Sequence, residues 1–200
     1  VGPPFIFNFR QLGSNCGIAG QHAAIELDGR IFWMGAKDFF VYDGAVKNLP
    51  CTVRRYVYDD FNFDQKEKVY AGTNQEFREV TWLYPSKNST EVDRYVSYNP
   101  VENYWTFGTT IFTTWEDKEV FQNIITTGQE ADGDNYLYTN EPEGIYTADG
   151  QRQEAFLESS EFDTTPPSYG PGDSIMYLDR IVPDFTINDG GRVTLNMKLK

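Results

Sequence analysis

Four short strand-like pieces follow one another early in the chain, with turn residues between them. The first is Ile25-Glu26-Leu27, and the Asp28-Gly29 pair after it is the strongest short signal for a hairpin. The other three pieces cover 30–34, 39–42 and 46–49. Short strands joined by tight turns pair with their neighbours in the chain. This stretch therefore predicts an antiparallel four-stranded meander, the unit from which propeller blades are built.

The end of this meander recurs twice along the chain. The three similar endings are Phe40-Val41-Tyr42-Asp43-Gly44, Tyr95-Val96-Ser97-Tyr98-Asn99-Pro100 and Ile145-Tyr146-Thr147-Ala148-Asp149-Gly150. Their turn residues Asp43, Asn99 and Asp149 are spaced at about 50 residues, which is close to the period of kelch-type propeller blades. A hairpin precedes the second and third endings, formed by 80–84 with 92–98 and by 136–139 with Ile145.

We therefore predict an all-β fold, a propeller-like array of antiparallel four-stranded meanders. An ordinary sandwich or a β-rich mixed fold stays open, because every antiparallel β protein repeats hairpins. Three partial units do not close a ring, since propellers need roughly four to eight blades. The chain begins with Val1-Gly2-Pro3-Pro4, without an initiator methionine, so we expect it to be part of a longer protein that supplies the missing blades.

The predicted organisation has three parts: a connecting segment over 1–24, the propeller-like domain over 25–165 and a terminal β segment over 166–200. One short helix is expected around 62–69, where Asn62 or Asp64 can cap a run of good helix formers. The stretch 193–200 alternates apolar and polar residues and predicts a terminal strand. Such a strand would close a blade or pair with the edge of a neighbouring chain.

The composition limits the classes of partner. Acidic residues outnumber basic ones by 30 to 17, giving a net charge of −13, which argues against a phosphate-binding surface. An acidic wall past which DNA slides without sticking would use the same charge for the opposite purpose, as a hypothesis. No apolar run approaches the roughly 18 residues needed to span a bilayer. The 40% hydrophobic residues, rich in Tyr and Phe, are enough for a sizeable core.

Residues that carry chemistry are few. Cys16 and Cys51 have no metal-ligand spacing, and His22 is the single histidine. We expect two free thiols, although a Cys16 to Cys51 disulfide stays possible. Cys16 with His22 is the one available nucleophile pair, and a structural thiol beside an unreactive histidine is the favoured interpretation. No nucleophile elbow is present, and Tyr169-Gly170-Pro171-Gly172-Asp173-Ser174 lacks the lysine of a phosphate loop.

Carboxylates offer further candidates. Asp59-Asp60, Glu116-Asp117 and Glu158 with Glu161 are each a conceivable glycosidase pair. Asp132-Gly133-Asp134-Asn135 has oxygen ligands for calcium but lacks the spacing of an EF-hand. In a chain this acidic, solvated carboxylates are the simpler interpretation. We therefore predict a protein that is not an enzyme, with no catalytic, cofactor-binding or metal-binding residues.

Aromatic residues on the surface would suit a sugar-binding module. Trp33, Trp82 and Trp105, however, lie in strand-like runs, where packing in the core is the commoner fate. We expect these three to be core residues.

Several strings, spread over most of the chain, resemble virion proteins of short-tailed bacteriophages. They are Ile31-Phe32-Trp33-Met34-Gly35, Phe40-Val41-Tyr42-Asp43-Gly44, Lys68-Val69-Tyr70-Ala71-Gly72, Glu79-Val80-Thr81-Trp82-Leu83-Tyr84-Pro85, Asp93-Arg94-Tyr95-Val96-Ser97-Tyr98-Asn99, Asn103-Tyr104-Trp105 and Asp179-Arg180-Ile181-Val182-Pro183-Asp184-Phe185. Together they look like the C-terminal part of tail proteins of the nozzle or packaged-DNA-stabilisation type.

The resemblance implies a structural role without a catalytic motif or cofactor. It implies a homo-oligomeric ring in the tail of the virion, made in the bacterial host cytoplasm. Such a ring contacts other tail or portal-adaptor proteins, carries fibres or spikes and lets DNA pass without specific binding. The competing classes are a carbohydrate-binding or carbohydrate-active propeller, for which sialidase-type Asp boxes are lacking, and a bacterial extracellular interaction domain.

Overall fold

The structure is a computed structural model that describes residues 10–118, 121–130, 133–142, 147–148 and 151–152, together with 177, 179–180, 182 and 193–196. The chain divides into two compact units, Val1–Tyr146 and Thr147–Lys200. In the second unit, β12 (Thr147–Ala148) and β13 (Gln151–Arg152) form an antiparallel pair. No helix among the described residues is long and apolar enough to cross a membrane.

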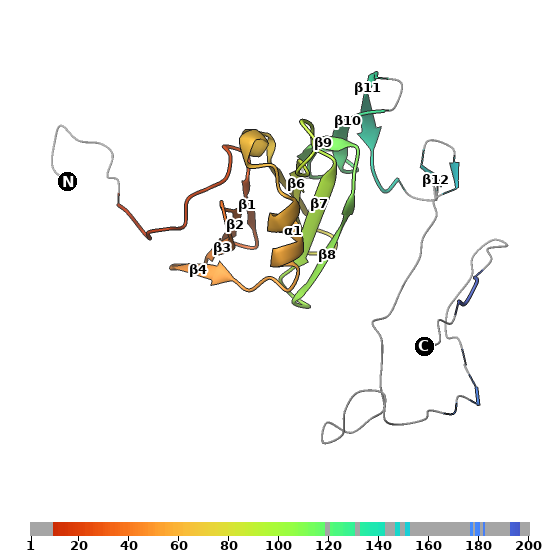
Figure 1. The fold of residues 1–200 in the computed structure, drawn as a ribbon, viewed down its shortest axis with the longest axis horizontal. Helices are drawn as coiled ribbons and strands as arrows, with labels where there is room; N and C mark the ends of the chain where they lie inside the picture. The colour runs from red at the N-terminus through yellow and green to blue at the C-terminus, as the bar shows by residue number, and fades with distance from the viewer. Residues whose placement is uncertain are drawn as a thin grey trace. The chain divides into compact units, whose positions relative to one another are not determined.

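The first unit contains three antiparallel sheets, and every strand pairs with its neighbours in the sequence (Figure 1). Sheet 1 consists of β1 (Ala24–Leu27), β2 (Arg30–Met34), β3 (Phe39–Tyr42) and β4 (Val46–Leu49). Sheet 2 consists of β5 (Tyr70–Asn74), β6 (Glu79–Tyr84), β7 (Arg94–Asn99) and β8 (Tyr104–Thr109). Sheet 3 consists of β9 (Phe112–Glu116), β10 (Ile125–Gln129) and β11 (Asn135–Thr139).

The all-β, meander-built fold predicted from the sequence is confirmed, and three of the four strands of the first meander have the predicted bounds, while β1 begins one residue earlier. Asp28 and Gly29 both have positive φ, 53° and 74°, as a two-residue hairpin turn requires. Asp43 follows β3 and Asn99 ends β7, so both stand at the turn from the third to the fourth strand of a sheet. The Asn99 side chain accepts hydrogen bonds from the backbone N–H groups of Val101 and Glu102 and holds that turn.

The third ending behaves differently. The third strand of sheet 3 is β11, and Asn140 follows it. The predicted marker Asp149 and its hairpin partner Ile145 lie outside the described residues. In the described part of the chain, the third unit therefore consists of β9, β10 and β11.

Two helices lie between sheets 1 and 2 in the sequence. The predicted one is present as a 3-10 helix, η1 (Phe63–Lys68), and the Asn62 side chain caps it by accepting from the N–H of Asp64 at 3.1 Å. The other, α1 (Arg54–Asp60), adds to the single helix that the sequence predicted. It has no side-chain cap and buries only Val57, so its sequence carries almost no helical signal.

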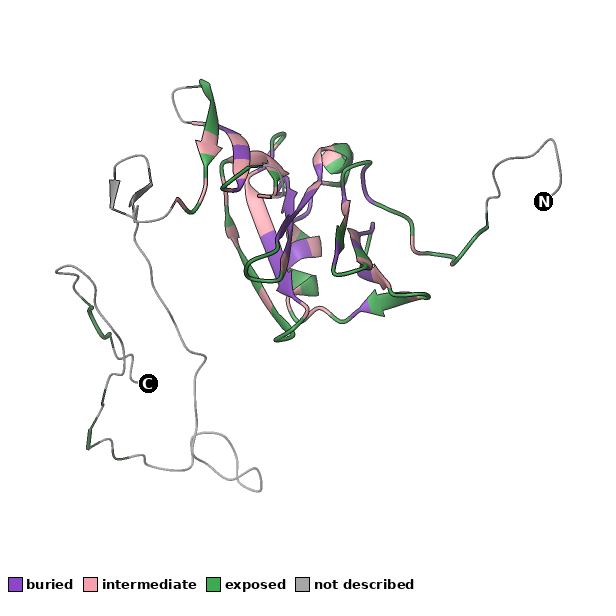
Figure 2. Ribbon diagram, turned by 180° about the vertical axis from the view of Figure 1, so that it is seen from behind, coloured by how far each residue is buried: buried purple, intermediate pink, exposed green. Residues whose placement is uncertain are grey.

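The main core lies between sheet 1 and sheet 2, with α1 closing one side of it (Figure 2). Phe39 of β3 packs 4.8 Å from Trp82 and 4.9 Å from Trp105, measured between ring centroids. Trp82 is fully buried, and Trp33 and Trp105 are half-buried. Ala19 and Ala23, from the predicted connecting segment, also belong to this core.

The first strands of the three sheets lie side by side. His22, just before β1, forms a parallel bridge with Tyr70 of β5. Further along β5, Gly72 lies against Trp115 of β9 and Thr73 contacts Asp117. In a propeller the first strands of neighbouring blades run alongside one another in this way. The described residues thus form an open array of meanders, which agrees with a propeller-like arrangement.

The predicted terminal segment falls mostly outside the described residues. Of the predicted terminal strand over 193–200, the described part, 193–196, is not in a strand, and Val193 and Leu195 are exposed. Alternation of apolar and polar residues produces a strand only where a neighbouring edge supplies hydrogen bonds. The predicted domain limits at 25 and 165 stay predictions.

Candidate functional site

A groove of about 320 Å³ runs along the first strands of the three sheets. We call it the first-strand groove. Its lining comes from the start of β1, from β5 and from the end of β9: Gln21, His22, Ala24, Ile25, Glu26, Tyr70, Ala71, Gly72, Thr73, Trp115, Glu116 and Asp117. No single stretch of sequence forms it, so the three meanders must pack together before the groove exists.

The groove is acidic. Glu26, Glu116 and Asp117 line it, and none of the described residues that line it is a lysine or an arginine. His22 stacks on Tyr70 with 5.2 Å between the ring centroids. A concave surface of one sign of charge repels a polyanion and attracts cations.

Asp117 is held in place by hydrogen bonds from β5 and the residue after it. Its carboxylate accepts from the Thr73 hydroxyl at 2.8 Å, from the Gln75 backbone N–H at 3.3 Å and from the Lys118 backbone N–H at 2.7 Å. The Trp115 indole N–H donates to the Thr73 carbonyl at 2.7 Å. Contacts between sheets therefore fix the position of this acid.

A second depression lies next to the end of β9, lined by Glu76, Lys118, Gln122, Asn123 and Glu141. Lys118 forms an ion pair with Glu76, and the hydrogen bond between them raises the pKa of the ammonium group. Asn123 donates to the backbone carbonyl of Glu141 at 3.1 Å. The ion pair and the hydrogen bond thus occupy Lys118, Glu76 and Asn123.

The candidate pair Cys16 and His22 is not brought together by any hydrogen bond. Both cysteines are free thiols. The backbone carbonyl of Cys16 accepts from the Trp33 indole at 2.9 Å, whereas His22 lies in the first-strand groove. Burial raises the pKa of the Cys51 thiol to about 11, which makes it a poor nucleophile near neutral pH.

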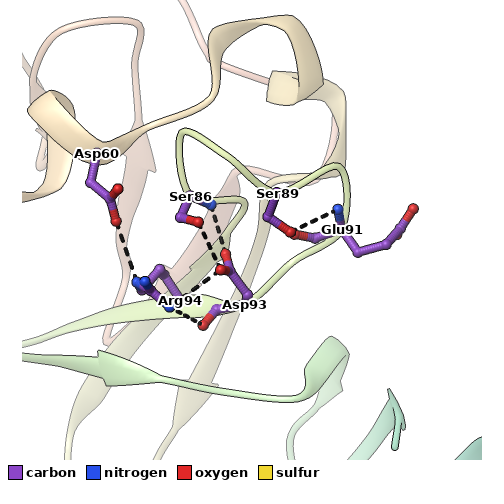
Figure 3. A network of polar contacts seen from close by, with 6 residues as sticks. All are labelled: Asp60, Ser86, Ser89, Glu91, Asp93 and Arg94. Carbon is purple, nitrogen blue, oxygen red and sulfur yellow. Dashed lines mark hydrogen bonds and ion pairs between the residues drawn. The ribbon is translucent and has the colours of Figure 1, made fainter. Parts of the chain in front are cut away.

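Asp59 and Asp60 each accept a hydrogen bond from an arginine. Asp59 accepts from Arg55 at 3.2 Å within α1, and Asp60 accepts from Arg94 of β7 at 3.3 Å. Arg94 also contacts Asp93, whose two carboxylate oxygens accept from the Ser86 N–H and hydroxyl, both at 2.7 Å (Figure 3). This network ties α1 to the loop between β6 and β7, which is a structural role.

The remaining acidic candidates are only partly described. Glu158, Glu161 and Asp132 lie outside the described residues. Gly133 has φ of +89°, and the Asp134 carbonyl accepts from Glu130, so this stretch is a tight turn. Within the described residues, no group of three or more His, Cys, Asp or Glu side chains is arranged to hold a metal ion.

No known protein family matches this sequence, and no curated protein matches it.

The sequence singled out two residues of the groove lining, but as a possible pair of catalytic carboxylates. Glu116-Asp117 stood out as a carboxylate pair, but Glu26, Thr73 and Trp115 did not. A usable signal was that Glu26 and Glu116 each lie near the end of a strand that opens a meander. That signal has meaning only once the first strands are known to lie together.

Proposed function

We propose that this protein is a structural component of a bacteriophage tail, a nozzle or tail-hub ring that forms part of the DNA-ejection channel and mounts fibres or spikes. The observation that carries the proposal is the first-strand groove, where Glu26, Glu116 and Asp117 are unaccompanied by basic residues. In a ring of such domains whose channel this groove lines, its acids face the DNA that passes through the channel. Repulsion between like charges keeps DNA from adhering.

Three further features support this proposal. The net charge of −13 is unsuited to holding DNA, and a channel must release it. The strings that resemble short-tailed phage proteins lie largely on the strands of sheets 1 and 2, where they build the shared core. The polar networks around Asp60, Arg94 and Asp93 are satisfied internally, as expected for a scaffold. A homo-oligomer in the virion tail, assembled in the host cytoplasm, is consistent with these features.

The test is the genomic position of the gene, together with peptide mass spectrometry of purified virions. We expect a portal or terminase gene nearby and peptides of this chain in virions at several copies per particle. A gene far from any virion gene, or virions without this chain, would overturn the proposal. Purified protein is also expected to show no retention of duplex DNA at physiological salt, and tight retention would contradict a non-adhesive channel.

A carbohydrate-binding β-propeller is the second candidate, and one observation favours it. Tyr56 of α1 and Phe107 of β8 are both exposed, with ring centroids 4.2 Å apart, and exposed aromatic rings are surfaces on which sugars stack. Retention of the protein on immobilised bacterial polysaccharide, lost in Tyr56→Ala, would favour this candidate. Retention unchanged by that substitution, or none at all, would reject it.

A further inference from the structure

Neighbouring sheets of this protein are joined by indole hydrogen bonds that cross from one sheet to the one before it. Trp82 of sheet 2 donates to the backbone carbonyl of Ala23, just before β1, at 3.1 Å. Trp115 of sheet 3 donates to the carbonyl of Thr73 in β5 at 2.7 Å. In both bonds the indole donor lies in the later sheet and the carbonyl acceptor lies in or just before the earlier one. Sheets 2 and 3 are therefore each bonded to the sheet that precedes them in the sequence.

Sheet 1 carries the same feature. Trp33 is the fourth residue of β2, just as Trp82 is the fourth residue of β6, and each of these is the second strand of its sheet. Side chains alternate along a strand, and Phe32 and Met34 belong to the core shared with sheet 2. Trp33 therefore lies on the opposite face, the one turned away from sheet 2. Its indole N–H donates to the carbonyl of Cys16 at 2.9 Å.

That opposite face is mostly apolar, although Glu26 pairs with Ile31 on it, and the described residues cover it only in part. We define the leading face of sheet 1 as Ile18, Ile31, Trp33 and Phe40. Trp33 and Phe40 stack with 5.5 Å between their ring centroids. Ile31 is 42% exposed and Ile18 46%. Single exposed apolar residues are ordinary, but a cluster around a stacked aromatic pair is typical of a contact surface.

At the other end of the array, the described residues leave a matching face of sheet 3 uncovered. Trp115 and the fully buried Thr126 face sheet 2, and Thr127 and Leu137 alternate with them onto the far side of sheet 3. We define the trailing face of sheet 3 as Thr114, Ile125, Thr127 and Leu137. Leu137 is 71% exposed.

The trailing face resembles the surface that sheet 2 presents to sheet 3. On sheet 2, that surface has the Thr81 and Ser97 hydroxyls bonded at 2.7 Å beside the buried Leu83. On sheet 3, the Thr114 and Thr127 hydroxyls are bonded at 2.6 Å, and Thr127 pairs with Leu137 in the sheet. Both surfaces combine a hydroxyl pair with leucine, which is the kind of face that the next sheet in this chain already covers.

We propose that the leading face of sheet 1 docks on the trailing face of sheet 3 of a second copy of this chain. The contact would repeat, between two copies, the two sheet-to-sheet interfaces that exist within the chain. Sheet 1 of one copy would pack on sheet 3 of the other, as sheet 2 packs on sheet 1 and sheet 3 on sheet 2. The inference rests on the proposed multi-copy ring and names the surfaces that build it. An interface made of two different faces is heterologous, so it produces a closed ring or an open filament and not a symmetric dimer.

The experiment is sedimentation velocity on the full chain and on three variants over a wide range of concentration. Ile31→Glu alters the leading face, and Leu137→Glu alters the trailing face. Val101→Glu is the matched control, because Val101 is 65% exposed in the turn between β7 and β8 and belongs to neither face. Circular dichroism and thermal melts first establish that all variants fold like the wild type, as expected for exposed positions.

We expect the wild type and Val101→Glu to self-associate. Ile31→Glu and Leu137→Glu should each weaken association by roughly 100-fold, because each introduces an uncompensated charge into an apolar contact. An equimolar mixture of these two variants should form a 1:1 dimer that grows no further, since each supplies one intact face. That mixed dimer is specific to a heterologous interface.

Three results would overturn the inference. They are association of either variant at wild-type strength, a wild type that is monomeric at every concentration, and a Leu137→Glu variant that dimerises alone through two leading faces. The genomic and virion tests of the proposed function are independent of these outcomes. A chain found in virions that assembles in spite of both substitutions would refute the interface and leave the function intact.

Discussion

The two sheet-to-sheet interfaces described in the first unit are built from different kinds of residue. Between sheets 1 and 2 lie large aromatic rings, with Phe39, Trp82 and Trp105 in mutual contact. Between sheets 2 and 3 lies a glycine under a tryptophan, Gly72 below Trp115, next to the hydroxyl pair of Thr81 and Ser97. Sheet 2 takes part in both, because the residues of β6 alternate between its two faces.

The two interfaces therefore have different roles, one in stabilising the fold and the other in positioning a side chain. Apolar area removed from water is the main favourable term in folding, so the aromatic interface carries most of the stability. The interface with sheet 3 contains hydrogen bonds that place Asp117 in the first-strand groove. Changes at the first interface should therefore unfold the protein, whereas changes at the second should mainly move β9.

The largest effect is expected from Trp82→Ala. The side chain is fully buried and packs on Phe39 and Trp105, so its loss leaves a large cavity. It also removes one of the two hydrogen bonds that the Ala23 carbonyl accepts. We expect the free energy of unfolding to fall by about 3–5 kcal/mol. Urea denaturation followed by circular dichroism measures it. Val101→Ala, at an exposed turn, should change it by less than about 0.5 kcal/mol, and equal effects of the two variants would refute the assignment of the core.

Gly72→Ala tests the second interface. A Cβ at this position would overlap the ring of Trp115. We expect a loss of about 1–3 kcal/mol from overpacking, accompanied by a shift in tryptophan fluorescence as Trp115 moves. Gly17→Ala is the control, since a Cβ there meets nothing within 4 Å. A Gly72→Ala variant as stable as Gly17→Ala would show that β9 does not pack on β5 as described.

The buried hydroxyl pair should show coupling. Thr81→Val leaves the Ser97 hydroxyl without its 2.7 Å partner, and we expect it to cost about 1 kcal/mol. Adding Ser97→Ala removes the orphaned group, so the double variant should lose less than the sum of the two single changes. The double-mutant cycle is measured by urea denaturation. Strict additivity would mean that the two hydroxyls do not interact.

The smallest effect concerns Cys51, beside the aromatic interface. Burial raises the pKa of its thiol to about 11, so only about a thousandth of it is thiolate at pH 8. In the Cys16→Ser variant, alkylation by iodoacetamide at pH 8 should be far slower in the folded protein than in urea. Equal rates would contradict the burial.

The same shift in pKa has a consequence for stability. The ordinary thiol pKa is 9.0, so between about pH 9 and 11 the unfolded chain loses this proton while the folded protein keeps it. The unfolded state is then favoured, and this contribution to stability declines as pH rises through that window. Cys51→Ser should remove that part of the decline in a series of urea melts from pH 8 to about 11.

Turn chemistry made the strands of sheet 1 predictable, since Asp28-Gly29 and Asp43-Gly44 each fix a reversal without help from distant residues. The 3-10 helix was predictable from the capping side chain of Asn62. Helix α1 was not, because its single buried residue, Val57, gives no periodic pattern, and the chain is helical there because it packs between sheets 1 and 2. For the third unit, the sequence predicts a turn at Asp149, which lies outside the described residues, whereas the third strand of sheet 3 ends before Asn140.

The candidate site was less predictable than the fold. Glu116 and Asp117 were recognisable as a pair, but nothing in the sequence relates them to Glu26, which lies in a different meander. Their common location depends on Trp115 reaching the backbone of Thr73. A contact of this kind joins residues from separate strands, and no local pattern encodes it.

The sequence by itself determined where this chain reverses and which residues alternate along each strand, because the sterics of turns and the twofold period of a strand act over a few neighbouring residues. Only the tertiary structure decided which face of each meander is covered. That choice depends on how the aromatic surfaces of sheets 1 and 2 fit each other, and it leaves Ile31 and Leu137 exposed at the two ends of the array. Long-range packing also brought three acids from two meanders to one edge.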